Sequence, residues 1–141
     1  MHKALNHMSL ARKAGRIELG EEPVGAAARA QKARLVIVAG DASDHTKRRA
    51  QSFVNGTGQQ CVILPFSKDE LGQAIGRTSL AIAAFTDPAL ALAFLQAMED
   101  PDRYASAIED LKTRTQRVRK HQQEAKAHQR NVRTGKAKKQ K

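Results

Sequence analysis

Side chains able to bind phosphates are concentrated at the C-terminal end of the sequence. Residues 111–141 hold 12 lysines and arginines against one acid, Glu124, whereas residues 1–110 hold 13 basic and 13 acidic residues. The formal net charge of +11 therefore lies entirely in the last 31 residues. Such a segregated charge predicts a polyanionic partner whose binding weakens steeply with salt, because each neutralised phosphate releases counterions. The candidate contacts in this segment are Arg114, Arg117, Arg119 and Lys120.

Two other uses of the basic segment have to be weighed. A solvated tail that only aids solubility would have the same composition. An anionic membrane would attract the same charges, but helices that lie on membranes need a broad apolar face. After Leu111 the only large apolar residues are Val118 and Val132, so the sequence argues against a membrane partner.

Residue types that carry out catalysis or bind metals are present without the spacing that they need. The single cysteine, Cys61, excludes an internal disulfide and lies in an apolar run typical of a buried strand thiol. Neither a Walker loop nor a dinucleotide fingerprint occurs. We therefore expect no enzyme, no metal, no cofactor and no small-molecule substrate. Ligand spacing to cysteines or acids is lacking around the five histidines, His2, His7, His45, His121 and His128.

The composition also limits the setting and the kind of partner. Aromatic residues make up only 4% of the chain, with no tryptophan and one tyrosine, which argues against a platform that stacks single-stranded bases. A lone cysteine is typical of a reducing compartment. The N-terminal residues lack an apolar signal segment, and no run approaches the ~20 apolar residues of a membrane span. These features predict a cytoplasmic protein.

The elements that would position the candidate contacts alternate along the chain. Apolar, β-branched runs predict buried strands, and capped or alanine-rich stretches predict helices. Ser67 with Glu70 forms a capping box, Gly15 suits a helix end, and Gly72 with Gly76 suggests close packing of their helix on a sheet. Strands are expected at 16–19, 35–40, 61–66 and 80–85. Helices are expected at 3–14, 21–33, from a cap at 43 or 44 to 54, at 67–76 and at 89–98.

This order of elements predicts an α/β protein, a three-layer α/β/α sandwich with a small mixed four-stranded sheet. Pro101 marks a boundary between a domain of residues 1–100 and a C-terminal extension of residues 101–141. Tyr104, Ile108 and Leu111 recur every three to four residues, so the extension should begin as a docked helix. It should continue as a solvated helix or a disordered basic arm, and residues 134–141 are expected to be disordered.

Three stretches of the chain resemble one known family. They are LARKAGRIELGEE at 10–22, LVIVAGDASDHTKRR at 35–49 and FSKDELGQAIGRTSLAIAAFTD at 66–87, of which the third is the most specific. The match covers roughly residues 3–98 and resembles the kink-turn-binding large-subunit ribosomal proteins (the L-seven-Ae / L-thirty-e family), closest to a short bacterial branch. The resemblance implies an α/β/α sandwich that binds structured RNA, with ribosomal RNA as the expected partner.

The resemblance also implies where the RNA would bind. In the family, one contact lies at the junction between the first strand and the second helix, which corresponds here to Gly20, Glu21 and Glu22. Lys13 and Arg16 are expected to flank this junction. The second contact is the loop before the last strand. There Arg77 would meet a phosphate, Leu80 would pack on an extruded base, and Thr78 and Ser79 would lie between them.

The junction departs from the family pattern of Gly, any residue, Asn, Glu, two residues and Lys. Glu22 stands where the family has Asn, Pro23 replaces the Glu, and Ala26 replaces the Lys. A carboxylate only accepts hydrogen bonds, proline lacks an amide donor, and alanine lacks the cation. These changes predict a weaker grip on a kink-turn and a larger contribution from the basic segment.

The sequence thus predicts a monomeric RNA-binding protein associated with the ribosome or with ribosomal RNA assembly. The domain would recognise RNA shape, and the basic segment would follow phosphates and become ordered on contact. The rival hypothesis is a protein-interaction module in translation whose basic tail is only a solubiliser or a non-specific anchor. A fragment of an RNA-modifying enzyme is a third reading, which the short chain disfavours.

Overall fold

Four short strands form one mixed sheet in the computed structural model, which describes residues 2–134. The strands are β1 (Ile17–Leu19), β2 (Leu35–Val38), β3 (Gln60–Ile63) and β4 (Ile82–Phe85), in the order β1-β4-β2-β3. β4 pairs antiparallel with both β1 and β2, and β2 pairs parallel with β3. The two apolar runs with the most continuous hydrophobicity supply the fully buried central strands, β2 and β4.

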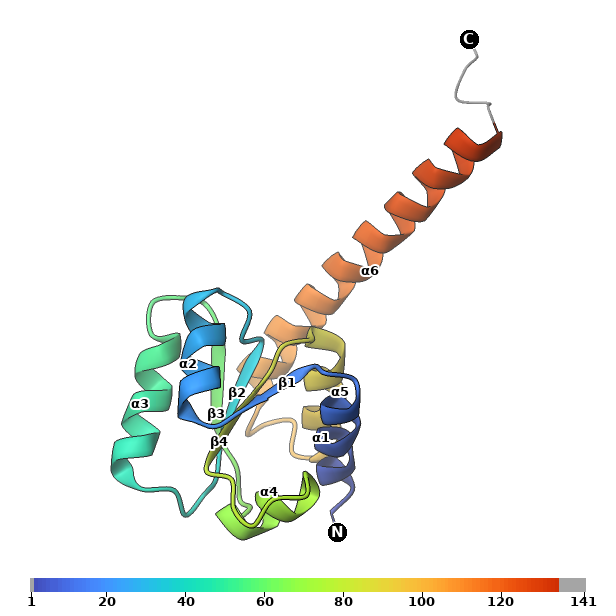
Figure 1. Ribbon diagram of the computed structural model, residues 1–141. Coiled ribbons are helices and arrows are strands. Elements are labelled where there is room, and N and C mark those ends of the chain that lie inside the picture. Colours follow the sequence, from blue (N-terminus) through green and yellow to red (C-terminus); the bar gives the residue numbers. More distant parts are fainter. Residues whose placement is uncertain (1, 135–141) are drawn as a thin grey trace.

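Helices cover both faces of the sheet (Figure 1). α2 (Glu21–Arg29) and α3 (Asp44–Val54) pack on one face, and α1 (Lys3–Lys13) and α5 (Pro88–Ala97) pack on the other. The short α4 (Lys68–Ala74) lies beyond one end of the strands, next to α1. The predicted three-layer α/β/α sandwich with a mixed four-stranded sheet is therefore confirmed.

Local signals in the sequence place several helix ends correctly. Ser67 and Glu70 form the predicted capping box, with the Ser67 hydroxyl accepting from the Glu70 amide at 3.1 Å. Ser43 caps α3, and Asp87 caps α5 with Pro88 in its first turn. Gly15 follows the end of α1 with a φ of 69°, the left-handed conformation expected there.

Several elements are shorter than predicted, and three of them show why. α2 ends at Arg29 rather than at residue 33, because the chain turns at Gln31, which has a φ of 60°. β3 ends at Ile63, two residues before Pro65. β4 begins at Ile82 rather than at residue 80, because the Leu80 amide donates to the Lys68 carbonyl and not to a strand.

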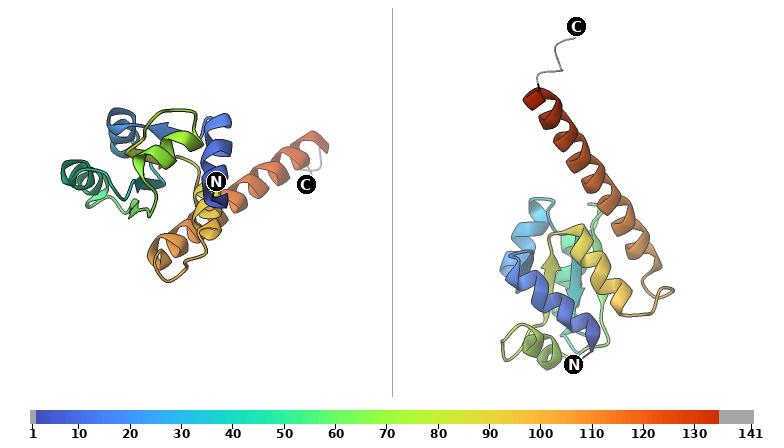
Figure 2. Two further views of the ribbon diagram at one scale, coloured as in Figure 1. Left: turned by 90° about the horizontal axis from the view of Figure 1, so that it is seen from below. Right: turned by 90° about the vertical axis from the view of Figure 1, so that its right-hand side faces the viewer.

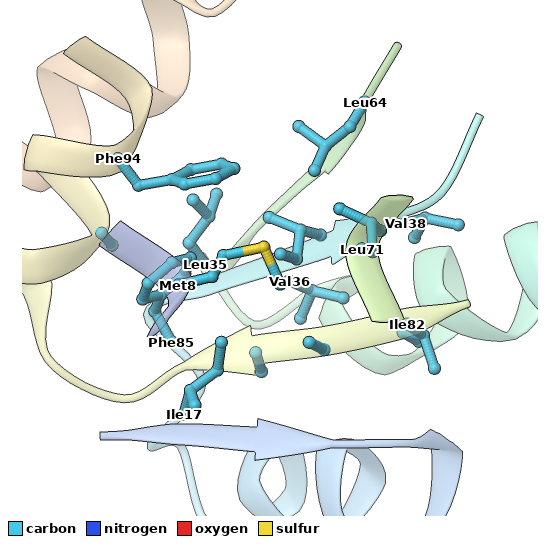
Figure 3. Close-up of a cluster of buried hydrophobic side chains, with 14 of the residues drawn as sticks. Met8, Ile17, Leu35, Val36, Val38, Leu64, Leu71, Ile82, Phe85 and Phe94 are labelled. Carbon is cyan, nitrogen blue, oxygen red and sulfur yellow. The ribbon is translucent and has the colours of Figure 1, made fainter. Parts of the chain in front are cut away.

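Side chains from both helical layers meet the central strands in one hydrophobic core. Figure 3 shows Met8 of α1 and Phe94 of α5 beside Leu35 and Phe85 of the sheet, all of them fully buried. The Phe85 and Phe94 rings are 5.1 Å apart between centroids, within the range of favourable aromatic pairs. Burial of these large side chains fixes how the helices sit on the sheet and thus where the strand ends project.

A final helix, α6 (Ala105–Thr134), docks on α5 and then leaves the body of the protein. Tyr104, Ile108 and Leu111 are buried in the common core, so packing continues past Pro101. Thr115 is the last buried residue between positions 105 and 127, and residues 116–127 are all exposed. Of the two predicted forms of the extension, the structure shows a helix as far as Thr134. Disorder was expected for residues 134–141; Thr134 is instead the last residue of the helix, and residues 135–141 fall outside the described residues.

The described part of the chain contains no helix that is both long enough and apolar enough to cross a bilayer.

Leu111→Ala should lower the free energy of unfolding by about 2–5 kcal/mol, because Leu111 is fully buried where α6 meets the core. Val118 lies two turns further along the same helix and is 41% exposed, so Val118→Ala should change the stability by no more than about 0.5 kcal/mol. Urea denaturation monitored by circular dichroism measures both. Equal effects of the two variants would show that the docked start of α6 does not belong to the core.

Candidate nucleic-acid interface

The two segments expected to contact RNA lie side by side at one end of the sheet. The amide of Gly20, which follows β1, donates to the carbonyl of Ile82 at 3.0 Å. Two residues before Ile82, the Leu80 amide donates to the Lys68 carbonyl at 2.9 Å. We call residues 20–22 and 77–80 together the junction edge. A single ligand can therefore reach both parts of it.

Gly20 occupies a backbone conformation that other residues avoid. Its φ of 96° and ψ of 163° fall in a region that is essentially restricted to glycine. This geometry turns the chain sharply from β1 into α2. The amides of Glu21 and Glu22, at the start of α2, donate to no group within residues 2–134. Since the N-terminus of a helix carries partial positive charge, these two donors suit an anionic or carbonyl-rich ligand.

The acids at this helix start are not equivalent. The Glu21 carboxylate forms an ion pair with Arg49 of α3, at 3.3 Å, which fixes its position and offsets its charge. Glu22 is exposed and forms no ion pair among the described residues. Its carboxylate can accept hydrogen bonds from a ligand but repels a nearby phosphate. Pro23 follows without an amide hydrogen, so the helix start offers two backbone donors rather than three.

The second loop presents three exposed side chains and one buried side chain. Arg77, Thr78 and Ser79 are exposed and can meet a ligand. Leu80 is only 4% exposed and belongs to the hydrophobic core, so the prediction that it packs on an extruded base is wrong. Its burial instead anchors the loop at the start of β4.

The backbone of this loop lies directly on α4. A methyl group added at Gly72 would lie 2.6 Å from the Ser79 amide nitrogen and 2.9 Å from the Arg77 carbonyl oxygen. Gly72 therefore allows close packing of its helix on the loop, and not on the sheet as predicted. Gly76 serves differently, because it turns the chain out of α4 with a φ of 75°.

The surroundings of the loop are close to electrically balanced. A hollow of about 430 Å³ lies beside it, lined by Asp69, Glu70, Gln73, Arg77 and Thr78. Arg12 of α1 is a further cation that the sequence did not single out, with its guanidinium 3.8 Å from the Cβ position of Gly76. Its contact with the loop depends on the packing of α1 against α4, for which the sequence carries no local signal.

Lys13 and Arg16 lie away from the junction edge. Lys13 is the last residue of α1, and the Arg16 carbonyl accepts from the Thr86 amide at 2.9 Å. Thr86 follows β4, whereas Gly20 is bonded to Ile82 at the start of that strand. The prediction that these two cations flank the junction is therefore wrong, because β1 separates Arg16 from Gly20 and points them to opposite ends of the sheet.

The basic helix also departs from the far end of the domain. In Figures 1 and 2, α4 lies at one end of the sheet. The part of α6 after Thr115, which we call the free part of α6, projects from the other end. Arg114 helps to attach α6 to the domain, because it forms an ion pair with Asp110 at 2.8 Å and donates to the Gly58 carbonyl at 3.3 Å. Arg117, Arg119 and Lys120 are exposed and form no ion pair with the side chains described for residues 2–127.

Groups suited to catalysis are not assembled at either end. Cys61 lies half-buried in the edge strand β3, and burial raises the pKa of its thiol to about 11. At neutral pH the thiol is therefore almost entirely protonated and a poor nucleophile. No group of three or more potential metal ligands occurs within the described residues.

The sequence matches a known family over most of the α/β/α domain, from α1 into α5. Residues 2–92 match the model of the Ribosomal protein L7Ae/L30e/S12e/Gadd45 family. The chain belongs to this family. A curated relative, the RNA-binding protein YlxQ of Enterococcus faecium, is 40% identical over 75 residues, which cover 53% of this chain and 72% of the relative. The resemblance inferred from the three stretches is confirmed.

Solved structures share the fold of this L7Ae-family chain at lower identity. A Bacillus halodurans protein of unknown function superposes with a TM-score of 0.65 at 24% identity, covering 71% of this chain and all of the other. The Giardia lamblia 15.5kD RNA binding protein gives a TM-score of 0.58 at 23% identity, and the match covers 72% of this chain and 85% of that protein. The family match ends within α5, so α6 lies outside it.

Gly72→Ala in this L7Ae-family domain should displace the loop at the junction edge and lower the free energy of unfolding by about 1–3 kcal/mol. The added methyl group meets backbone atoms of Ser79 and Arg77, which cannot move independently of the loop. Gln73→Ala, at the exposed neighbouring position of α4, is the matched control. Chemical shifts of the 77–80 amides and urea denaturation measure the two effects. Unchanged amide shifts in Gly72→Ala would contradict the packing described above.

Proposed function

We propose that this protein binds structured RNA and is not an enzyme. Its family membership supports this proposal, together with a relative that is named an RNA-binding protein. The observation that supports it most directly is the hydrogen bond from the Gly20 amide to the Ile82 carbonyl. This bond brings the β1–α2 junction and the 77–80 loop to one edge of the sheet. Two segments that are distant in sequence thereby offer one continuous surface to a ligand.

The junction edge suits recognition of RNA shape. Free amides at the start of α2 can donate to phosphate or carbonyl oxygens, and Arg77 can pair with a phosphate. Thr78 and Ser79 add hydroxyl groups that donate and accept. Since the chain has few aromatic residues, stacking of single-stranded bases contributes little. A folded RNA that presents its backbone and base edges in a fixed geometry is the better fit.

Within that function, we propose that the target is a kink-turn-like RNA of the ribosome or of ribosomal RNA assembly. The protein would bind it in the cytoplasm as a monomer. The substitutions Glu22, Pro23 and Ala26 remove a two-way hydrogen-bonding group, a backbone donor and a cation from the junction. Binding to an isolated kink-turn should therefore be weak. The exposed cations of α6 supply phosphate contacts that compensate for this loss.

Filter binding of the full chain to a kink-turn RNA whose flanking helix is long enough to reach α6, over a series of salt concentrations, tests the proposal. Log K should fall linearly with log salt, and Arg117→Ala/Arg119→Ala should flatten the slope by about 1.5, since each lost phosphate contact removes about 0.7–0.9. The double variant Lys3→Ala/Arg48→Ala removes the same charge from other exposed positions and should leave the slope almost unchanged. If the unaltered protein binds no RNA at low salt, the proposed function is wrong and a protein-interaction module becomes the better hypothesis.

Arg77→Ala should weaken binding to every structured RNA and reduce the salt slope by about 1, because it removes one phosphate contact at the junction edge. Its side chain is exposed and forms no ion pair among the described residues, so the fold should not change. The same assay measures the effect, with circular dichroism as the check on folding. An unaltered affinity would place the RNA away from the 77–80 loop.

A further inference from the structure

Basic side chains gather at the end of the sheet opposite the junction edge. The register across the sheet aligns Ile17, Phe85, Leu35 and Gln60 in one row. The residues just outside that row include Arg16 before β1 and Arg34 before β2. Since neighbouring strands lie about 4.8 Å apart and β4 separates these two, their backbones are about 10 Å apart on the same border.

Hydrogen bonds to neighbouring segments fix the main chain of both arginines. The Arg16 carbonyl accepts from Thr86 at 2.9 Å, and the Arg34 amide donates to Phe85 at 2.8 Å. On the far side of Arg34, Arg114 of α6 reaches the Gly58 carbonyl, which lies just before β3. Arginines therefore follow this border from β1 across to β3. We call Arg16, Arg34, Arg114 and Arg117 the arginine row.

The row continues onto the free part of α6. A hollow of about 180 Å³ lies between that helix and the body, lined by Arg34, Pro88, Arg114, Arg117 and Val118. Arginines from two distant segments thus line one concave surface. The exposed cations Arg119 and Lys120 follow on the next turn of the helix.

Acidic side chains nearby are too few to neutralise this surface. Asp110 pairs with Arg114 at 2.8 Å, and Asp87 is occupied in capping α5, where it accepts from the Leu90 amide at 2.9 Å. Arg16, Arg34 and Arg117 form no ion pair among the side chains described, those of residues 2–127. The junction edge differs, since Glu21, Glu22, Asp69 and Glu70 are set among its cations. The two ends of the sheet therefore differ in charge, with the arginine row the more positive.

We propose that the arginine row and the start of the free part of α6 form a second RNA-binding surface, separate from the junction edge, so that one protein holds two segments of RNA at once. The proposal rests on the proposed function for the class of ligand. The guanidinium groups match phosphate oxygens, which they bind in pairs of hydrogen bonds irrespective of sequence. The surface thus binds RNA backbone, whereas the junction edge recognises shape.

The two surfaces are far enough apart for each to bind its own RNA segment at the same time. They lie at opposite ends of the strands, and α6 extends away from the junction edge (Figure 2). From Thr115 to Thr134 the helix continues for about 30 Å at 1.5 Å per residue. A short RNA hairpin seated at one end does not cover the other end. A second hairpin, or a distant helix of the same folded RNA, can therefore dock there.

A bridging assay with the full-length protein tests this inference. A kink-turn hairpin and an unrelated short duplex RNA carry donor and acceptor dyes, and the protein is added at a concentration below that of either RNA. The unaltered protein should bring the two RNAs together and produce energy transfer. Arg16→Ala/Arg34→Ala should reduce the transfer at least several-fold and flatten the salt slope for the duplex by about 1.5, while the kink-turn hairpin still binds.

The matched control is again Lys3→Ala/Arg48→Ala, which removes two positive charges from exposed sites outside the residues of both surfaces. Its energy transfer should equal that of the unaltered protein. If the protein binds each RNA alone but the two RNAs compete and never occur together, a single surface exists and the inference falls while the proposed function stands. If Arg16→Ala/Arg34→Ala bridges as well as the control, the arginine row is not the second surface. If no RNA is bound, the proposed function itself fails.

Discussion

The pairing of β4 with both β1 and β2 determines where every candidate contact of this protein lies. Because β4 is antiparallel to both neighbours, its first residue meets the end of β1 and its last residue meets the starts of β1 and β2. Gly20 and the 77–80 loop are thereby joined at one border, and Arg16 and Arg34 are aligned at the other. Helical layers bury the pairing on both faces, so these positions cannot shift without loss of the core.

The two ends of the sheet have different chemistry. The junction edge belongs to the family match and combines backbone amides with a balanced set of charges. The opposite end is extended by α6, which continues beyond the family match and carries a large positive charge. Recognition of shape at one end and neutralisation of phosphates at the other are complementary ways to hold a folded RNA. The departures at Glu22, Pro23 and Ala26 are easier to understand in a protein that does not rely on the junction alone.

The sequence was sufficient to predict the order of the elements, because apolar runs, caps and glycines act over a few neighbouring residues. It also implied, through the family resemblance, that Gly20 and Arg77 share an edge. Positions that depend on strand direction were harder to predict from the sequence. Arg16 is only four residues from Gly20, yet a three-residue strand carries it to the other end of the sheet. Leu80 stands between a polar loop and an apolar run, and only the folded structure shows that its side chain faces the core and not a ligand.

The outer border of β3 has a consequence for association between copies of the chain. An uncovered edge strand offers amides and carbonyls to a strand of another molecule, and the exposed Ile63 would favour such contact. Here the guanidinium of Arg103 donates to the Ile63 carbonyl at 3.1 Å, and the beginning of α6 packs beside the strand. A carbonyl already engaged by a cation is a poor template for a further strand. Arg103 and the start of α6 thus disfavour extension of the sheet by a strand of another copy.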